Sequence, residues 1–522
     1  MLNDHTPIFG KNVIETLSEG MYDNPLFLFR EYVQNAADAI DAAEKNGILE
    51  KGAGEIVLKI DPVKRFISFE DNGTGICQAE VPRMLANIGD SQKDRKENKG
   101  FRGIGRLGGL GYCQIVRFET SAKGEPIQTT LEWDAHALHE ILADKDEHMH
   151  AGELIQHITS MSSAPCAEDK HFFRVSLTNV NENSGELLDI DEVRKYLSMV
   201  APVPFDYEKF RFVGDIEQFL KKNKLPPLHE YQIYLNGDEI RKGYEAPLKI
   251  ENNKSVEIRG IEPRTITVDN KIIGWYWFCI SLFEGVLPKK CWQRGIRLRK
   301  ANIQIGEADC LSNHPRRGTP LWKEDRGNNY FIGEVHALDE DLIPNSRRDY
   351  FNPNDACSRF EKALTDAFKE LHVLYHQASQ LRSENTKIQM ATNARKKFEA
   401  KERAGEFLNP QDREEAKSEV EKLEAEKQAA LKRIDKIYDK ASSGAIEKVA
   451  DAYMPEVLGV FDQMNEKPFV PNNEPEQGYA NENIPQDKMD VLKIVFEVLD
   501  SLLPPDESKP VRDEIIRRFV NK

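Results

Sequence analysis

Three polar residues, Glu31, Asn35 and Asp38, recur at positions i, i+4 and i+7 of the segment REYVQNAADAI. On a helix this spacing puts all three side chains on one stripe. A carboxylate there could take a proton from water, and a carboxamide oxygen could ligate Mg²⁺, which prefers hard oxygen donors. The stripe therefore suits metal-assisted hydrolysis, although by itself such a triplet is more often a solvated helix surface.

A helix that carries this stripe is predicted from its flanking residues. Asn24 can cap the helix, and Pro25 fits the first helical position, where no N–H group is needed. A core-facing side is supplied by Phe27, Leu28, Val33, Ala36, Ala37 and Ile40.

The motif FEDNGTGI follows two strand-like runs, residues 55–60 and 65–69. Its glycines, Gly73 and Gly75, let the backbone approach a flat ligand and adopt positive φ. A buried Asp71 could accept a hydrogen bond from the exocyclic amine of adenine, whereas guanine would present an oxygen there. The alternative is an Asp-Asn-Gly turn that only ends a hairpin.

The motif NKGFRGIGRLGGLG is rich in glycine, which costs chain entropy. Its glycines are Gly100, Gly103, Gly105, Gly108, Gly109 and Gly111. Such a segment makes sense where backbone N–H groups must wrap an anion beside a helix N-terminus. It matches neither the GxxxxGK[ST] loop nor a dinucleotide fingerprint. A flexible linker fits poorly, because apolar residues are interleaved with the glycines.

Together the three motifs resemble the GHKL ATPases, a superfamily that includes gyrase, heat-shock protein 90 chaperones, histidine kinases, MutL and the MORC proteins. The resemblance covers roughly the first third of the chain and implies ATP and Mg²⁺ as ligands. It implies that Glu31 is the general base and Asn35 the Mg²⁺ ligand, with Asp38 on the same cofactor-binding stripe. It also implies that Asp71 reads adenine.

Further positions follow from the same resemblance. Gly73 and Gly75 would shape the adenine pocket, and the glycines of residues 100–109 would cradle phosphate. The segment IGDSQK resembles a Ser-x-Lys segment of the superfamily, so Ser91 and Lys93 would reach phosphates. The later strand FFRVSLTN lacks the usual Gly-Thr pair.

A second resemblance favours the heat-shock protein 90 and MORC branch. Residues 295–306 and 330–351 are similar to the chaperone middle domain, in which an arginine-bearing loop reaches the γ-phosphate. Either Arg347 or Arg348 would be that sensor, because an arginine fork binds phosphate oxygens bidentately. The alternative is that these arginines pair with Asp349 or other acids on a surface loop. A histidine kinase is disfavoured, since the motifs begin at the N-terminus.

Composition limits the partners. The 522 residues carry a net charge of −16, so a nucleic acid contact would need a local basic patch, for which the candidates are residues 289–290, 294–300 and 395–403. The cysteines are scattered without a CxxC pair, which disfavours a zinc site and fits a reducing cytoplasm. The sequence has no apolar signal segment and no long apolar run, so we expect no membrane.

The expected fold class is α+β in several parts. We expect a Bergerat-type ATP-binding sandwich over residues 1–183 and a transducer-like α/β domain over residues 184–355, which includes a strand at 231–235. A helical coiled-coil hairpin over residues 356–464 follows from apolar residues at 3-4 spacing that are broken at residues 405–410. A flexible linker at 465–487 and a helical tail at 488–522 complete the chain.

These expectations suggest a cytoplasmic, homodimeric ATPase in which hydrolysis drives a clamp-like, chaperone-like remodelling cycle. Two alternatives stay open. A MORC-like or defence-associated ATPase would clamp nucleic acid, and a nucleotide-gated scaffold would bind ATP without appreciable turnover.

Overall fold

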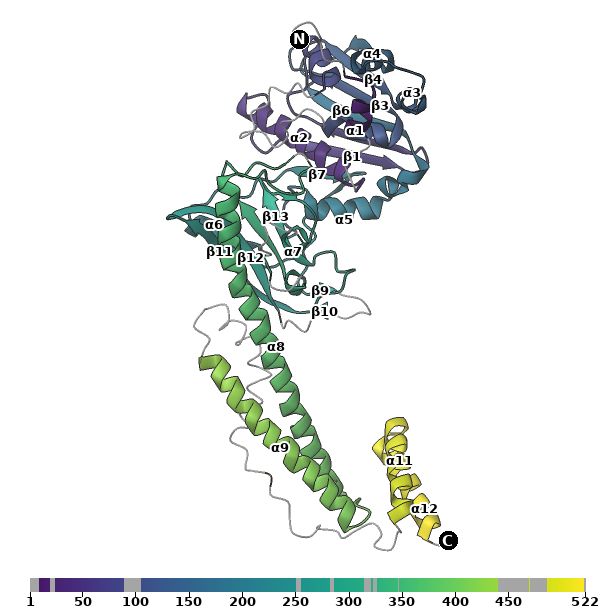
Figure 1. Ribbon diagram of the computed structural model, residues 1–522, viewed down its shortest axis with the longest axis vertical. Helices are drawn as coiled ribbons and strands as arrows, with labels where there is room; N and C mark the ends of the chain where they lie inside the picture. Colours follow the sequence, from purple (N-terminus) through teal and green to yellow (C-terminus); the bar gives the residue numbers. More distant parts are fainter. Residues whose placement is uncertain are drawn as a thin grey trace, which may run out of the picture. The chain divides into compact units, whose positions relative to one another are not determined.

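A computed structural model describes residues 9–18, 24–88, 105–249, 255–281, 286–313, 321–322, 326–345, 347–439, 469 and 486–520. The chain forms two compact units, Met1–Val373 and Leu374–Lys522, which we describe separately. The fold is mixed α+β, with sheets in the first unit and helices in the second (Figure 1).

The first unit begins with an eight-stranded sheet in the order β5-β4-β3-β6-β2-β1-β7-β8. Along β1, Ile56, Leu58 and Ile60 are buried and alternate with more exposed residues, as expected for a sheet with one covered face. The strands are β1 (Glu55–Asp61), β2 (Phe66–Asp71), β3 (Cys113–Ser121), β4 (Ile127–Asp134), β5 (Thr159–Pro165), β6 (Phe172–Val180), β7 (Gln232–Leu235) and β8 (Asp238–Glu239).

Helices pack on the covered face of this sheet, and α2 (Phe27–Lys45) lies against β1 and β2. The predicted cap is displaced, because Asn24 Oδ1 accepts from the backbone N–H of Leu26 while the helix begins at Phe27. Pro25 thus lies in the turn before the helix. The other helices of this region are α1 (Asn12–Ser18), α3 (Ala135–Ala143), α4 (Ala151–Ile158) and α5 (Ile190–Val200), while α6 (Val213–Lys222) packs on the second sheet.

Strand β7 corrects the sequence-based assignment of residues 231–235 to the second domain. It pairs in parallel with β1 of the first sheet, with Ile56 opposite Ile233 and Leu58 opposite Leu235. The pairing is long-range, and an apolar strand pattern does not tell which sheet it joins. The domain boundary at residue 183 stays a prediction.

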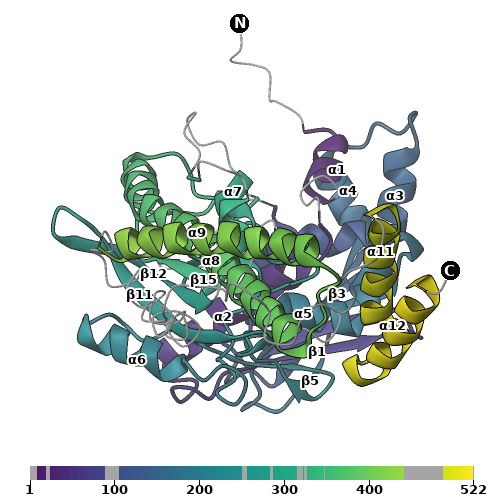
Figure 2. The same ribbon diagram turned by 90° about the horizontal axis from the view of Figure 1, so that it is seen from below.

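A second, five-stranded sheet has the order β11-β12-β15-β13-β14, and β11, β12 and β15 lie side by side in Figure 2. Its core combines the aromatic side chains of β12 with residues of α6. The strands are β11 (Ile258–Val268), β12 (Lys271–Ser281), β13 (Gly295–Lys300), β14 (Ile303–Ile305) and β15 (Ile332–Ala337). Two short strands, β9 (Leu248–Lys249) and β10 (Ser255–Val256), pair separately, and α7 (Cys310–Asn313) follows β14.

The second unit holds an antiparallel helical hairpin made by the latter part of α8 (Asp355–Ala404) and α9 (Pro410–Asp439). Arg413, near the start of α9, pairs with Glu402 at 2.6 Å, while Arg433 pairs with Glu384 at 3.0 Å. The break between the helices falls where the glycine and proline residues predict it.

A terminal helix pair follows, α11 (Gln486–Leu502) and α12 (Pro505–Val520), which share an apolar cluster around Leu492 and Phe496. The predicted linker lies almost wholly outside the described residues. Among the helices that are described, none is long and apolar enough to cross a membrane.

Candidate active site

The predicted polar stripe of α2 faces inward. Glu31 is only 7% exposed and Asp38 only 5%, while Asn35 is half-buried. A solvated surface stripe is therefore the wrong description for the two carboxylates. Buried acidic side chains on a helix that covers a sheet are typical of a functional site rather than of solvation.

The loop after β2 packs tightly against α2. Asp71 is 4% exposed, and its Oδ1 accepts a hydrogen bond from the Gly73 N–H at 2.9 Å. A Cβ atom at Gly73 would lie 2.7 Å from the backbone of Ala39 on α2. Gly75 has a φ of +64°, and a Cβ there would lie 1.9 Å from the Ser121 carbonyl oxygen. Both glycines are thus required by close backbone approach.

The ends of β3 and β6 hold this loop in place. The Thr120 hydroxyl accepts from the Ile76 N–H at 2.8 Å and donates to the Phe172 carbonyl at 2.9 Å. His171 Nδ1 lies 2.7 Å from the Gly73 carbonyl oxygen, so that nitrogen carries the proton it donates. Thr120 and His171 carry no local signal in the sequence, because the pairing of β3 with β6 is what brings them to the Asp71 loop.

Part of the glycine-rich motif closes over Glu31. Residues Gly105–Gly111 form a 3-10 turn, in which a Cβ at Gly105 would lie 2.6 Å from Glu31 Oε2. A Cβ at Gly109 would lie 2.8 Å from the Tyr32 hydroxyl. Gly108 lies in the same turn. Ser91, Lys93, Gly100 and Gly103 lie outside the described residues, so their assignment remains a prediction.

The loop before α8 brings one of the two candidate arginines to Glu31. Arg348 Nε lies 3.0 Å from Glu31 Oε1, and both side chains are 9% exposed. Arg348 has a φ of +54°, an unusual value for a bulky residue. The Arg347 side chain is exposed, and its carbonyl accepts a hydrogen bond from Arg30 Nη2 at 3.4 Å. The alternative, in which both arginines pair with acids on a surface loop, therefore does not describe Arg348, which is buried against Glu31 of α2.

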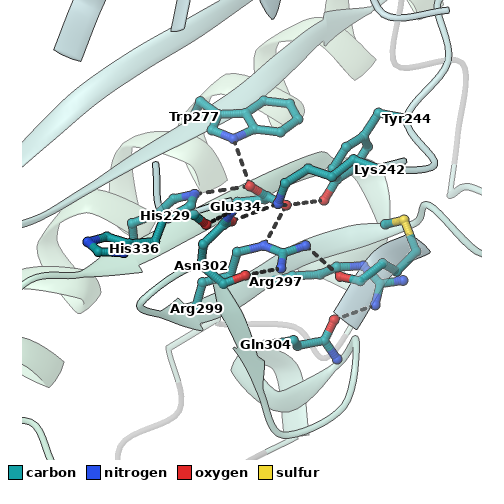
Figure 3. Close-up of polar contacts among 11 residues, drawn as sticks. His229, Lys242, Tyr244, Trp277, Arg297, Arg299, Asn302, Gln304, Glu334 and His336 are labelled. Atoms are coloured by element: carbon teal, nitrogen blue, oxygen red, sulfur yellow. Dashed lines mark hydrogen bonds and ion pairs between the residues drawn. The ribbon is translucent and has the colours of Figure 1, made fainter. Parts of the chain in front are cut away.

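A buried ionic cluster joins the segment after β8 to strands β13 and β15 of the second sheet (Figure 3). Glu334 of β15 accepts from Lys242 at 3.2 Å and from Tyr244 at 3.0 Å, and Arg299 Nε lies 2.5 Å from it. His336 Nε2 lies 3.0 Å from the other carboxylate oxygen. Several donors on one fully buried carboxylate fix the relative positions of the strands that carry them.

Burial sets the protonation of these groups. Desolvation, with the nearby Arg299 charge, lowers the pKa of Lys242 to about 7, and desolvation lowers the pKa of His336 to about 4. The Arg299 and Lys242 charges hold the pKa of Glu334 well below its usual range despite burial. Glu334 is therefore ionised and His336 neutral at neutral pH.

The described residues fit a nucleotide with Mg²⁺. Two buried carboxylates, Glu31 and Asp71, and the half-buried Asn35 carboxamide supply the acceptor and oxygen groups that such a ligand needs. Asn35 lies one turn after Glu31, where its carboxamide oxygen would hold Mg²⁺.

Comparisons with known proteins agree with this geometry. Residues 28–163 match the family described as histidine kinase-, DNA gyrase B-, and HSP90-like ATPase. The chain is 26% identical over 141 residues to the chaperone protein HtpG of Alcanivorax borkumensis, which covers 24% of this chain and 23% of that protein. It is 27% identical over 143 residues to the chaperone protein HtpG of Yersinia pestis, with the same coverage.

The chain thus spans about a quarter of the length of the curated relatives it matches. The matched segment contains Glu31, Asn35, Asp71 and the glycine motifs, the residues on which the resemblance was noted. The resemblance to the GHKL superfamily and its HSP90-like members is therefore confirmed for this part of the chain.

Proposed function

We propose that the protein binds ATP with Mg²⁺ and hydrolyses it to drive a clamp-like conformational cycle. The observation that carries this proposal is the convergence of Glu31, the Asp71 loop, the glycine turn and Arg348 on one side of the first sheet. The loop before α8 thus reaches α2 on the first sheet, and a cycle that converts hydrolysis into movement of the chain would act through that contact.

Each residue has a role in this proposal. Asp71 accepts the hydrogen bond of the adenine amine, and the Gly73–Gly75 backbone admits the base. Gly105, Gly108 and Gly109 offer backbone N–H groups to the phosphates. Mg²⁺ held by Asn35 supplies charge neutralisation when bound.

Glu31 takes the proton of the attacking water, and an arginine of residues 347–348 binds the γ-phosphate. The contact of Arg348 with Glu31 favours Arg348 over Arg347 for the second role.

For the biological role we favour chaperone-like remodelling of proteins by a homodimer. The likeness to chaperone protein HtpG supports this choice. A structural observation also supports it: Arg297 and Arg299, part of the basic segment 294–300, are 6% and 0% exposed. Both guanidiniums lie inside the fold, so they cannot contribute to a nucleic acid surface on this segment.

Two measurements separate this proposal from the alternatives. Glu31→Ala should abolish turnover while nucleotide binding persists, whereas a scaffold would keep its function in that variant. Partners should then be recovered with the Glu31→Ala protein in its ATP-bound state. Client proteins are the expected result, and DNA recovery with a steep salt dependence of ATPase stimulation would favour the nucleic acid clamp.

A further inference from the structure

Two neighbouring residues of α2 contact two neighbouring residues of the loop before α8. Glu31 pairs with the Arg348 side chain at 3.0 Å, and Arg30 donates to the Arg347 carbonyl at 3.4 Å. The first contact joins two charged side chains, while the second holds only the loop backbone. The two contacts can therefore change independently.

The loop backbone is fixed by further hydrogen bonds on either side of Arg348. The Arg348 N–H donates to the Asn345 carbonyl at 3.2 Å, and its own carbonyl accepts from Gly306 N–H at 2.7 Å. Asn345 N–H donates to the Tyr350 carbonyl at 2.8 Å. With the backbone held in this way, a change in the partner of Arg348 would be a movement of its side chain.

The Arg348 contact occupies one oxygen of the candidate base. Oε1 of Glu31 faces the guanidinium at 3.0 Å. A water molecule that donates its proton needs a carboxylate oxygen within hydrogen-bond reach, and the guanidinium competes with water for Oε1. Proton transfer to Oε1 therefore requires Arg348 to leave.

We propose that the γ-phosphate removes Arg348 from Glu31, so that ATP, but not ADP, releases the base. A terminal phosphate carries more charge than a carboxylate and presents oxygens that a guanidinium binds bidentately. This exchange neutralises the phosphate and frees Glu31 in one movement. Arg30 is the positioning residue that keeps the loop docked while the side chain moves. The inference rests on the proposed function, since it requires ATP in this site.

The test compares affinities for a non-hydrolysable ATP analogue and for ADP by calorimetry. Glu31→Gln removes the competitor for Arg348, so this variant should bind the analogue more tightly than the wild type, on the order of tenfold. The gain should vanish when Arg348→Gln is also present, because no guanidinium remains to be released. ADP affinity should change little in either variant.

The Arg348→Gln background distinguishes the proposed exchange from a simpler explanation, in which Glu31→Gln only relieves repulsion between the carboxylate and the γ-phosphate. If Glu31→Gln tightened analogue binding equally with and without Arg348, repulsion would explain the gain and the exchange would be wrong. Arg347→Gln serves as the matched control, since its side chain is exposed, and the gain should persist in that background. A wild type that binds neither nucleotide would instead refute the proposed function.

The positioning role of Arg30 has its own readout. Arg30→Met should lose most of the preference for the analogue over ADP, while the unchanged ADP affinity reports an intact site. Arg30→Lys should restore part of that preference, because a lysine can still donate to the Arg347 carbonyl. A preference unaffected by Arg30→Met would exclude this role.

Discussion

Arg299 donates a hydrogen bond from Nη2 to the backbone carbonyl of Met199 in the last turn of α5. The same guanidinium pairs with Glu334 on β15. Helix α5 is thereby tied directly to the buried ionic cluster of the second sheet. A shift of α5 against that sheet would have to break a buried, charge-assisted contact, which is costly.

Lys242 is expected to make stability depend on pH above neutrality. The pKa of Lys242 is about 7 in the folded protein, whereas its ordinary value is 10.5. Between pH 7 and pH 10.5, Lys242 therefore takes up a proton when the protein unfolds. Stability from this group therefore rises with pH across that window, by about 1 kcal/mol per pH unit. Denaturant unfolding from pH 7 to 9 should show a smaller slope for Lys242→Met than for the wild type.

The control for that measurement is Lys300, whose pKa burial lowers to about 8 and which contributes a similar slope in both proteins. The charged groups that face Lys242 are Arg299, Glu334 and Glu230. Equal slopes for the two proteins would show that Lys242 keeps its proton throughout the range.

Gly75→Ala should abolish nucleotide binding. A Cβ at this position would meet the Ser121 carbonyl oxygen at 1.9 Å, and backbone atoms cannot give way cheaply. Gly52→Ala is the matched control, because Gly52 also has positive φ, at +82°, but nothing lies within 4 Å of its added Cβ. Comparing the nucleotide affinities of the two variants distinguishes the effect of the close approach to Ser121 from the effect of backbone strain at positive φ. Equal losses would mean that φ alone matters.

Gly105→Ala should act on the chemical step. Its added Cβ would lie 2.6 Å from Oε2 of Glu31, the end of a flexible side chain, so the carboxylate can shift without unfolding the site. We expect kcat to fall roughly tenfold or more, because misplacing a general base is costly, with little change in ADP affinity. An unchanged kcat would argue against Glu31 as the base.

Asp71→Asn should weaken ATP binding, because the amide cannot offer the same two acceptors to the adenine amine. An affinity loss of about 1.5–3 kcal/mol is expected for a hydrogen bond to a charged group. Binding of ATP and GTP to both proteins provides the check, and the preference for ATP should narrow. Unchanged ATP affinity would remove the adenine assignment.

Local patterns were enough to predict α2, the Asp71 loop and the glycine turn. Each of these features is indicated by residues that are close together in the sequence, such as Glu31 and Asn35 at i, i+4 spacing. The choice between Arg347 and Arg348 could not be made in this way. It depends on a positive φ at Arg348 and on contacts with Glu31 far away in the sequence.

The buried ionic cluster was missed for the same reason. Lys242, Arg299 and Glu334 lie in three separate segments, and charged residues in strands usually face solvent. The one available signal was the alternation of Arg297 and Arg299 within GIRLRK, which we interpreted as a possible basic surface. The pairing of β13 with β15 brings Arg299 to Glu334, while Arg297 binds Gln304 and the Trp292 carbonyl instead.

The pairing of β7 with β1 has a practical consequence for any attempt to isolate the nucleotide-binding region. A fragment that stopped at residue 183 would lack β7 and leave β1 at the edge of the sheet, with its backbone N–H and C=O groups open to other chains. Ile56 and Leu58 would lose the neighbouring apolar side chains of Ile233 and Leu235. Such a fragment should aggregate, whereas one that extends through β8 should stay monomeric.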